Sequence, residues 1–301
     1  MSKRLEELDL EINDKDADSP IVYPYPTSLR AFFIVCASLV LSMGVTIYFI
    51  VKSGKAVVVL LAQALFSILL IVIPWIFIKT KNYRKDVFRL QKGKAKKMVY
   101  LFVVLINLSI ILFFSGMIIN SYDPKDLNSY DSSTTTRLTS IGIGILVFFS
   151  VALCPGIFEE ILFRGFFQKS VEYRTKKQRL STIIIGFIFS LAHFDLTVFG
   201  FFYKWILGII FGQYAARTDS IFPGMLGHFI NNSIAIILQN YLHDLNEIFT
   251  GPSAIIMSLV CLIISIISYI IFVKKFKYRE FWLHDTNSDD DLDSSSAEFY
   301  L

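Results

Sequence analysis

The chain has 301 residues, of which 54% are hydrophobic and 18% are charged, and its mean hydropathy is +0.57. These values exclude an ordinary soluble globular domain and are typical of a chain that crosses a membrane several times. The formal net charge of +4 is small. The basic residues of the chain cluster in loops, where they indicate membrane topology, so we expect no nucleic-acid partner.

Apolar stretches with about the length of a membrane-spanning helix recur along the whole chain. The candidate spans are 30–51, 56–78, 98–119, 139–168, 181–199, 203–216, 221–242 and 253–273. We therefore predict an all-α fold, a polytopic transmembrane bundle of about eight helices. The span at 203–216 is the shortest of the set and the least typical of a transmembrane helix.

Basic residues predict the orientation of these spans. Nine Lys or Arg residues lie in 79–97 and five lie in 169–179. Because basic loops face the cytoplasm, both termini are predicted there, in a multi-pass integral membrane protein of the cell (inner) membrane if the host is a prokaryote. The expected organisation is an acidic cytoplasmic N-terminal tail (1–29), a transmembrane domain (30–273) and a polar, acidic cytoplasmic C-terminal tail (274–301).

Strongly polar side chains inside the spans are few, and one set of them lies on three spans. This set is Glu159, Glu160 and Arg164 on the fourth span, His193 on the fifth, and His228, Asn231 and Asn232 on the seventh. A charge at the bilayer centre costs about 2.5–3.5 kcal/mol or more, so such residues face a bundle interior or a cavity and are usually functional.

The depths of these polar residues agree. At a helical rise of ~1.5 Å per residue, Glu159, His193 and His228 lie roughly 14–21 Å from a charged residue at the cytoplasmic end of each span. Those charged residues are Lys169, Arg179 and Asp219. The common level predicts one buried site, in a cavity among spans four, five and seven.

Helical spacing assigns the two glutamates different tasks. Glu160 and Arg164 are four residues apart and can neutralise each other on one helix face. Glu159 points about 100° away from Glu160 and remains an unpaired carboxylate in a dehydrated environment, which suits a catalytic base. His228 and Asn232 are also four residues apart, so both can point at one ligand.

Pro155 and Gly156 interrupt the fourth span. A straight helix over 139–168 would be about 45 Å long, which is too long for an upright crossing. We expect Pro155 to kink the helix or break it into two halves. The backbone groups freed there then need partners or water, which a cavity can supply.

Three motifs in this order resemble those of the CAAX protease and bacteriocin-processing (CPBP/Abi) family of intramembrane proteases, which is related to the Ras-converting prenyl-protein protease. The resemblance covers about 139–242 of this chain. The motifs are E-E-x-x-x-R (Glu159, Glu160, Arg164), F-x-x-x-H (Phe189, His193) and H-x-x-x-N (His228, Asn232).

The resemblance implies a membrane endopeptidase with a catalytic cavity open toward the cytoplasm. Glu159 would be the general base that activates a water together with His193, and His228 and Asn232 would stabilise the oxyanion. The Glu160–Arg164 pair would hold the geometry of the site. The implied substrate is a membrane-bound peptide or lipidated protein, as in prenylated CAAX substrates, at the lipid bilayer.

The same residues leave two alternatives open. Glu159, His193 and His228 also form a two-histidine, one-carboxylate set for a divalent metal, with zinc the best match, so the sequence is compatible with either no cofactor or one metal ion. Intramembrane acids and histidines also occur in proton-coupled transporters. A non-enzymatic transporter, or a binding protein in peptide immunity, is therefore the alternative to a protease.

Overall fold

The computed structural model describes residues 26–53, 55–78, 87–90, 140–194, 198–248 and 252–278. All the regular elements in these ranges are helices, as the sequence predicted. In chain order they are α2 (Ser28–Ser53), α3 (Ala56–Leu69), α4 (Val72–Phe77), α8 (Ile141–Val147), η1 (Phe148–Leu153), α9 (Cys154–Glu160), η2 (Ile161–Gln168), α10 (Lys169–Thr175), α11 (Gln178–Leu191), α12 (Val198–Thr218), α13 (Phe222–Ile248) and α14 (Pro252–Lys275).

Four helices within the described ranges are long and apolar enough to cross a membrane. They are Ser28–Ser53, Ala56–Phe77, Ile141–Thr175 and Ser258–Lys275. The chain is therefore an integral membrane protein with a helical bundle. The predicted span at 98–119 and most of both predicted tails lie outside the described residues, and the number of about eight spans stays a prediction.

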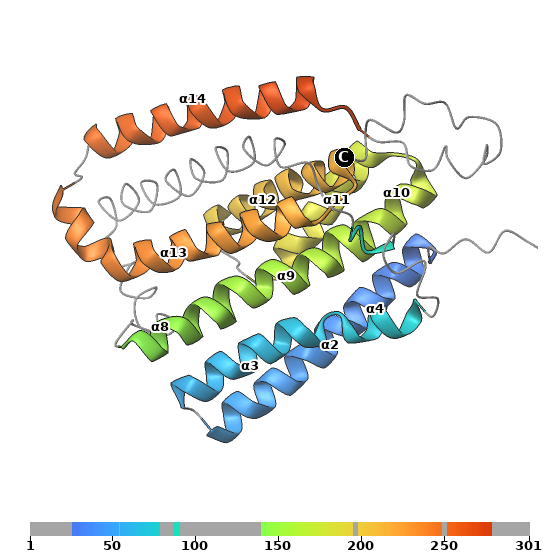
Figure 1. The fold of residues 1–301 in the computed structure, drawn as a ribbon, viewed down its shortest axis with the longest axis horizontal. Helices are drawn as coiled ribbons and strands as arrows, with labels where there is room; N and C mark the ends of the chain where they lie inside the picture. The colour runs from blue at the N-terminus through green and yellow to red at the C-terminus, as the bar shows by residue number, and fades with distance from the viewer. Residues whose placement is uncertain are drawn as a thin grey trace, which may run out of the picture.

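The central element is one continuous helix of 35 residues, Ile141–Thr175, formed by α8, η1, α9, η2 and α10 end to end. Figure 1 shows it running through the middle of the molecule, with α2, α3 and α4 on one side and α11, α12 and α13 on the other. The buried side chains of α2, η2 and α11 meet in one hydrophobic cluster around Phe163, Phe166 and Phe189. The residues of the first motif thus lie on the helix that both groups contact.

Of the two outcomes predicted at Pro155, a kink or a break into two halves, the break does not occur, because the chain stays helical through this residue. The preceding stretch, η1, winds as a π-helix, and Pro155 lies in the first turn of α9. Single π-helical turns inside α-helices are frequent at functional sites. Gly156 lets α13 approach α9 closely, since a Cβ there would lie 3.0 Å from the backbone nitrogen of Phe229.

Several helix boundaries differ from the predicted spans. The short span at 203–216 is in fact the 21-residue helix α12. Helix α11 ends at Leu191, so His193 lies in the turn that follows and not inside a helix spanning 181–199. Lys169 and Asp219, used above as surface markers of depth, are 0% and 2% exposed, so they are buried residues and not boundary markers.

Candidate active site

The imidazoles of His193 and His228 both face one carboxylate oxygen of Glu159. Glu159, on α9, places its Oε2 atom 3.7 Å from Nε2 of His193 and 3.9 Å from Nε2 of His228. His193 is carried by the turn after α11, and His228 lies on α13. Residues 34 and 69 positions apart from Glu159 in the sequence thus share one site, and they include the two intramembrane histidines that the sequence singled out.

The exposed fractions of the three side chains indicate from which side the site is accessible. The side chain of His228 is 5% exposed and that of Glu159 is 12% exposed, whereas that of His193 is 27% exposed. Burial of a carboxylate in contact with imidazoles, and not with a lysine or arginine, leaves it available for proton transfer. Access from outside the protein is therefore on the His193 side.

The hydrogen bonds of the two imidazoles fix which nitrogen faces Glu159. Nδ1 of His193 lies 2.8 Å from the carbonyl oxygen of Phe189, and a carbonyl only accepts, so this nitrogen carries a proton. Nδ1 of His228 lies 3.3 Å from Oε1 of Glu160, whose carboxylate accepts in the same way. In the neutral form of each ring, Nε2 is then the lone-pair nitrogen, and both lone pairs face the Glu159 carboxylate.

Glu160 and Arg164 form the expected pair, and both side chains are completely buried. Nη1 of Arg164 lies 3.2 Å from Oε1 of Glu160. The guanidinium also lies 4.1 Å above the ring of Phe189, a cation–π contact with the phenylalanine of the second motif. Glu160 therefore connects Arg164 to His228, and Phe189 connects Arg164 to the turn that carries His193.

One aromatic residue of the site belongs to none of the three motifs. The ring of Phe211, on α12, stacks on the imidazole of His228 with centroids 5.3 Å apart and an interplanar angle of 22°. It is fully buried and also lies 5.5 Å from the Arg164 guanidinium. A buried phenylalanine in an apolar helix has no sequence feature that separates it from ordinary packing, so sequence analysis could not find it.

Asn232 has a structural contact that explains part of the Pro155 region. Its Nδ2 donates to the carbonyl oxygen of Val151, 3.1 Å away. Val151 lies four residues before Pro155, which has no N–H to give to that carbonyl. The amide of Asn232 therefore gives this carbonyl a partner that Pro155 cannot supply, as expected for backbone groups near a proline at membrane depth. The amide nitrogen carries a second hydrogen for another acceptor.

The orientation of Asn232 depends on its neighbours on α13 and α12. Nδ2 of Asn231 donates to Oδ1 of Asn232 at 3.4 Å, and the hydroxyl of Tyr203 donates to Oδ1 of Asn231 at 2.7 Å. These contacts fix which end of each amide is the oxygen. Tyr203 is a site-supporting residue that the motifs did not indicate.

The three predicted metal ligands, Glu159, His193 and His228, lie close to one another. Glu159 Oε2 faces both Nε2 atoms at distances somewhat longer than those between ligands of one tetrahedral zinc ion, about 3.3 Å. Within the described part of the chain, no group of three or more His, Cys, Asp or Glu side chains is placed to hold a metal ion.

Comparison with known proteins gives one match. Residues 141–234 match a family model described as Rce1-like, type II CAAX prenyl endopeptidase Rce1-like. The match contains every residue of the three motifs, from Glu159 to Asn232. No curated protein and no solved structure matches the chain. Residues 141–234 are thus similar to the Rce1-like type II CAAX prenyl endopeptidases, in agreement with the resemblance that the motifs predicted.

Proposed function

We propose that this protein is an intramembrane endopeptidase that hydrolyses a peptide bond of a membrane-associated substrate with a Glu159-activated water. The observation that carries the proposal is the convergence of Glu159 Oε2 with the Nε2 atoms of His193 and His228 at 3.7 and 3.9 Å. Glu159 Oε2 and His193 Nε2 are two acceptors that suit a water molecule, which can donate one hydrogen bond to each and present its own lone pair to a carbonyl carbon.

In this mechanism the water donates one hydrogen to Glu159 Oε2 and the other to Nε2 of His193. Its oxygen attacks the carbonyl carbon of the substrate as Glu159 takes a proton. The carbonyl oxygen becomes an oxyanion, and collapse of the tetrahedral intermediate breaks the C–N bond. The proton held by Glu159 passes to the leaving amine, so the carboxylate is regenerated.

The oxyanion needs donors aimed at it, and two residues are candidates. His228 can donate from Nε2 when its ring carries both protons, while Nδ1 keeps its contact with Glu160 at 3.3 Å. Asn232 can donate the amide hydrogen that Val151 does not use. Glu160 and Arg164 are positioning residues. Glu160 contacts the imidazole of His228, and Arg164 contacts Phe189, whose carbonyl oxygen is bound by His193.

The family match over residues 141–234 and the apolar helices around the site support a proposal for the substrate class. We propose a membrane-bound peptide or lipidated protein, of the prenylated CAAX type, which reaches the site from the lipid bilayer. The proposed topology places both termini on the cytoplasmic side, since the basic segments 79–97 and 169–179 favour that side. An opening of the site toward the cytoplasm is proposed from the family resemblance alone.

The experiment is cleavage of a farnesylated CAAX peptide by the purified protein in liposomes, with products identified by mass and with metal content measured in parallel. The proposal predicts a single cleaved bond and the same rate with and without a strong chelator. Loss of cleavage on chelation, with recovery on addition of zinc, would replace the water-only mechanism by a metal-dependent one. Absence of cleavage, with Glu159-dependent solute flux in sealed vesicles, would favour a transporter instead.

A further inference from the structure

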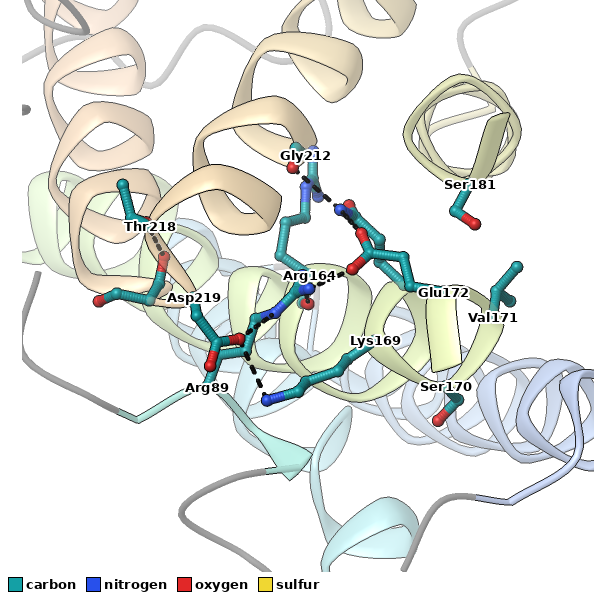
Figure 2. A network of polar contacts seen from close by, with 12 residues as sticks. Arg89, Arg164, Lys169, Ser170, Val171, Glu172, Ser181, Gly212, Thr218 and Asp219 are labelled. Atoms are coloured by element: carbon teal, nitrogen blue, oxygen red, sulfur yellow. Dashed lines mark hydrogen bonds and ion pairs between the residues drawn. The ribbon is translucent and has the colours of Figure 1, made fainter. Parts of the chain in front are cut away.

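A second group of buried charges lies beyond the candidate active site. Its members are Arg89, Lys169, Glu172 and Asp219, which are 0 to 2% exposed, and the amide of Gln168 joins them. Two positive and two negative side chains balance one another. Figure 2 shows Arg89 between Asp219 and Glu172, with Lys169 reaching Asp219. We call these five residues the charge cluster.

Arg89 is the centre of the charge cluster. Its Nε lies 3.2 Å from Oδ1 of Asp219, its Nη2 is paired with Glu172, and its Nη1 donates to the backbone carbonyl of Arg164 at 3.2 Å. Burial by itself lowers the pKa of a guanidinium, but attraction to Glu172 and Asp219 outweighs this, so the pKa of Arg89 is raised and the group stays charged. One side chain thus contacts three partners.

The partners of Arg89 belong to the central helix, which carries the first motif, and to the segment just before α13, which carries the third motif. Glu172 and Arg164 lie on the continuous helix Ile141–Thr175, which also carries Glu159 and Glu160. Asp219 lies three residues before α13, the helix of His228, and the backbone N–H of Ile221 donates to the carbonyl of Arg89 at 3.2 Å. Lys169 Nζ makes a second bridge between the same helices, 3.1 Å from Asp219 Oδ1.

The backbone around Arg89 is held closely against the central helix. Gly165 adjoins Arg164, and a Cβ on it would lie 2.7 Å from the carbonyl oxygen of Phe88. Arg89 itself has a φ of 52°, in the left-handed region that non-glycine residues adopt only at a cost. Such a conformation persists where surrounding contacts determine it. The position of Arg89 is therefore fixed both by its backbone and by the contacts of its guanidinium.

We propose that Arg89 is a positioning residue for the proposed reaction, setting the position of the Glu159 helix relative to the His228 helix. The contacts form a continuous chain from Arg89 to the backbone of Arg164, from the Arg164 side chain to Glu160, and from Glu160 to His228. This inference rests on the proposed function. A substitution at Arg89 is therefore expected to alter catalysis although Arg89 does not contact the substrate.

The test separates positioning from plain stability. In Arg89→Lys the charge is kept but the planar guanidinium fork is lost. In the charge-balanced pair Arg89→Gln with Glu172→Gln, no buried charge is left unmatched, because Lys169 and Asp219 still pair. The matched control is Arg217→Lys, a buried arginine on α12 that contacts Gln213 and the carbonyl of Phe276. Cleavage is measured at temperatures well below each melting transition.

Positioning predicts that kcat falls at least tenfold in both Arg89 variants with KM within about twofold of the parent value. The charge-balanced pair is expected to melt close to the parent protein, and Arg217→Lys is expected to keep its kcat. Recovery of kcat together with stability in the charge-balanced pair would overturn the proposal, because a purely structural role predicts that result. Failure of both Arg89 variants to fold would overturn it as well.

A distance measurement keeps the inference separate from the proposed function. Spin labels on the exposed residues Arg174 of α10 and Phe222 of α13 report on the two helices whether or not the protein cleaves peptides. The inference predicts a broader or shifted distance distribution in Arg89→Lys and an unchanged one in Arg217→Lys. Unchanged distances in both variants would contradict it. Absence of cleavage by the parent protein would instead contradict the proposed function.

Discussion

Oε1 of Glu160 lies 3.3 Å from Nδ1 of His228, and the same oxygen lies 3.2 Å from Nη1 of Arg164. The two adjacent glutamates therefore have different partners: Glu160 holds an imidazole and a guanidinium, and Glu159 faces the Nε2 atoms. This division gives the two positions different mutational signatures.

Glu160→Leu removes one partner of a buried ion pair and leaves the Arg164 guanidinium without its carboxylate. Breaking a buried pair in this way costs about 3–5 kcal/mol, so we expect a large fall in melting temperature together with loss of activity. Glu159→Gln removes no such partner and should melt within a few degrees of the parent protein. Thermal unfolding of the two variants side by side checks the difference, and equal melting temperatures would contradict the assignment.

Gly165→Ala is expected to be strongly destabilising. The added Cβ would lie 2.7 Å from the carbonyl oxygen and 3.0 Å from Cα of Phe88, and a backbone contact of this kind cannot yield as a side chain can. Overpacking of this type costs about 1–3 kcal/mol. Gly142→Ala is the matched control, since a Cβ there meets no atom within 4 Å. Thermal unfolding in detergent should separate the two, and equal stability would contradict the close packing of residues 87–90 on η2.

Tyr203→Phe removes a single hydroxyl, which donates to Oδ1 of Asn231 at 2.7 Å. Without it the amides of Asn231 and Asn232 lose an orienting contact, so we expect kcat to fall about three- to tenfold. The free energy of unfolding should fall by about 0.5–1.5 kcal/mol, as for the loss of one hydrogen bond. Tyr48→Phe, on α2, is the control and should retain activity. Equal kcat values for the two variants would contradict a supporting role of Tyr203 in the site.

Membrane topology can be tested with two exposed lysines at opposite ends of their helices. Lys177 lies between α10 and α11, and Lys55 precedes α3. In a background with the three native cysteines replaced, Lys177→Cys should react with an impermeant thiol reagent only from the cytoplasmic side and Lys55→Cys only from the other side. Reaction of Lys177→Cys from outside would reverse the proposed orientation.

Local sequence signals predicted the parts of the site that depend on helix periodicity and intramembrane charge. The Glu160–Arg164 pair follows from i,i+4 spacing, and the meeting of Glu159, His193 and His228 was expected from their depth. That depth was counted from Lys169 and Asp219, which the structure shows to be buried ion-pair partners. The convergence of these residues therefore depends on tertiary packing and not on the markers used to predict it.

The charge cluster shows why the rest escaped prediction. Glu160, Arg164, Gln168 and Glu172 recur every four residues along one helix, and this repeat was a readable signal of a polar stripe. Nothing in the sequence, however, pairs that stripe with Arg89, 75 residues before Arg164. Arg89 is one of nine basic residues in 79–97, and the positive-inside rule interprets all nine as markers of topology, because a charge count cannot distinguish a solvated lysine from a buried arginine.

The central claim is that the Glu159 carboxylate activates the water that cleaves the substrate. Turnover of a farnesylated CAAX peptide by purified Glu159→Gln in liposomes tests it most directly, because glutamine keeps the shape of the side chain and removes the base. Our account predicts a fall in kcat of at least 100-fold, within the range that a general base contributes, with melting temperature preserved. Turnover at the parental rate would contradict it.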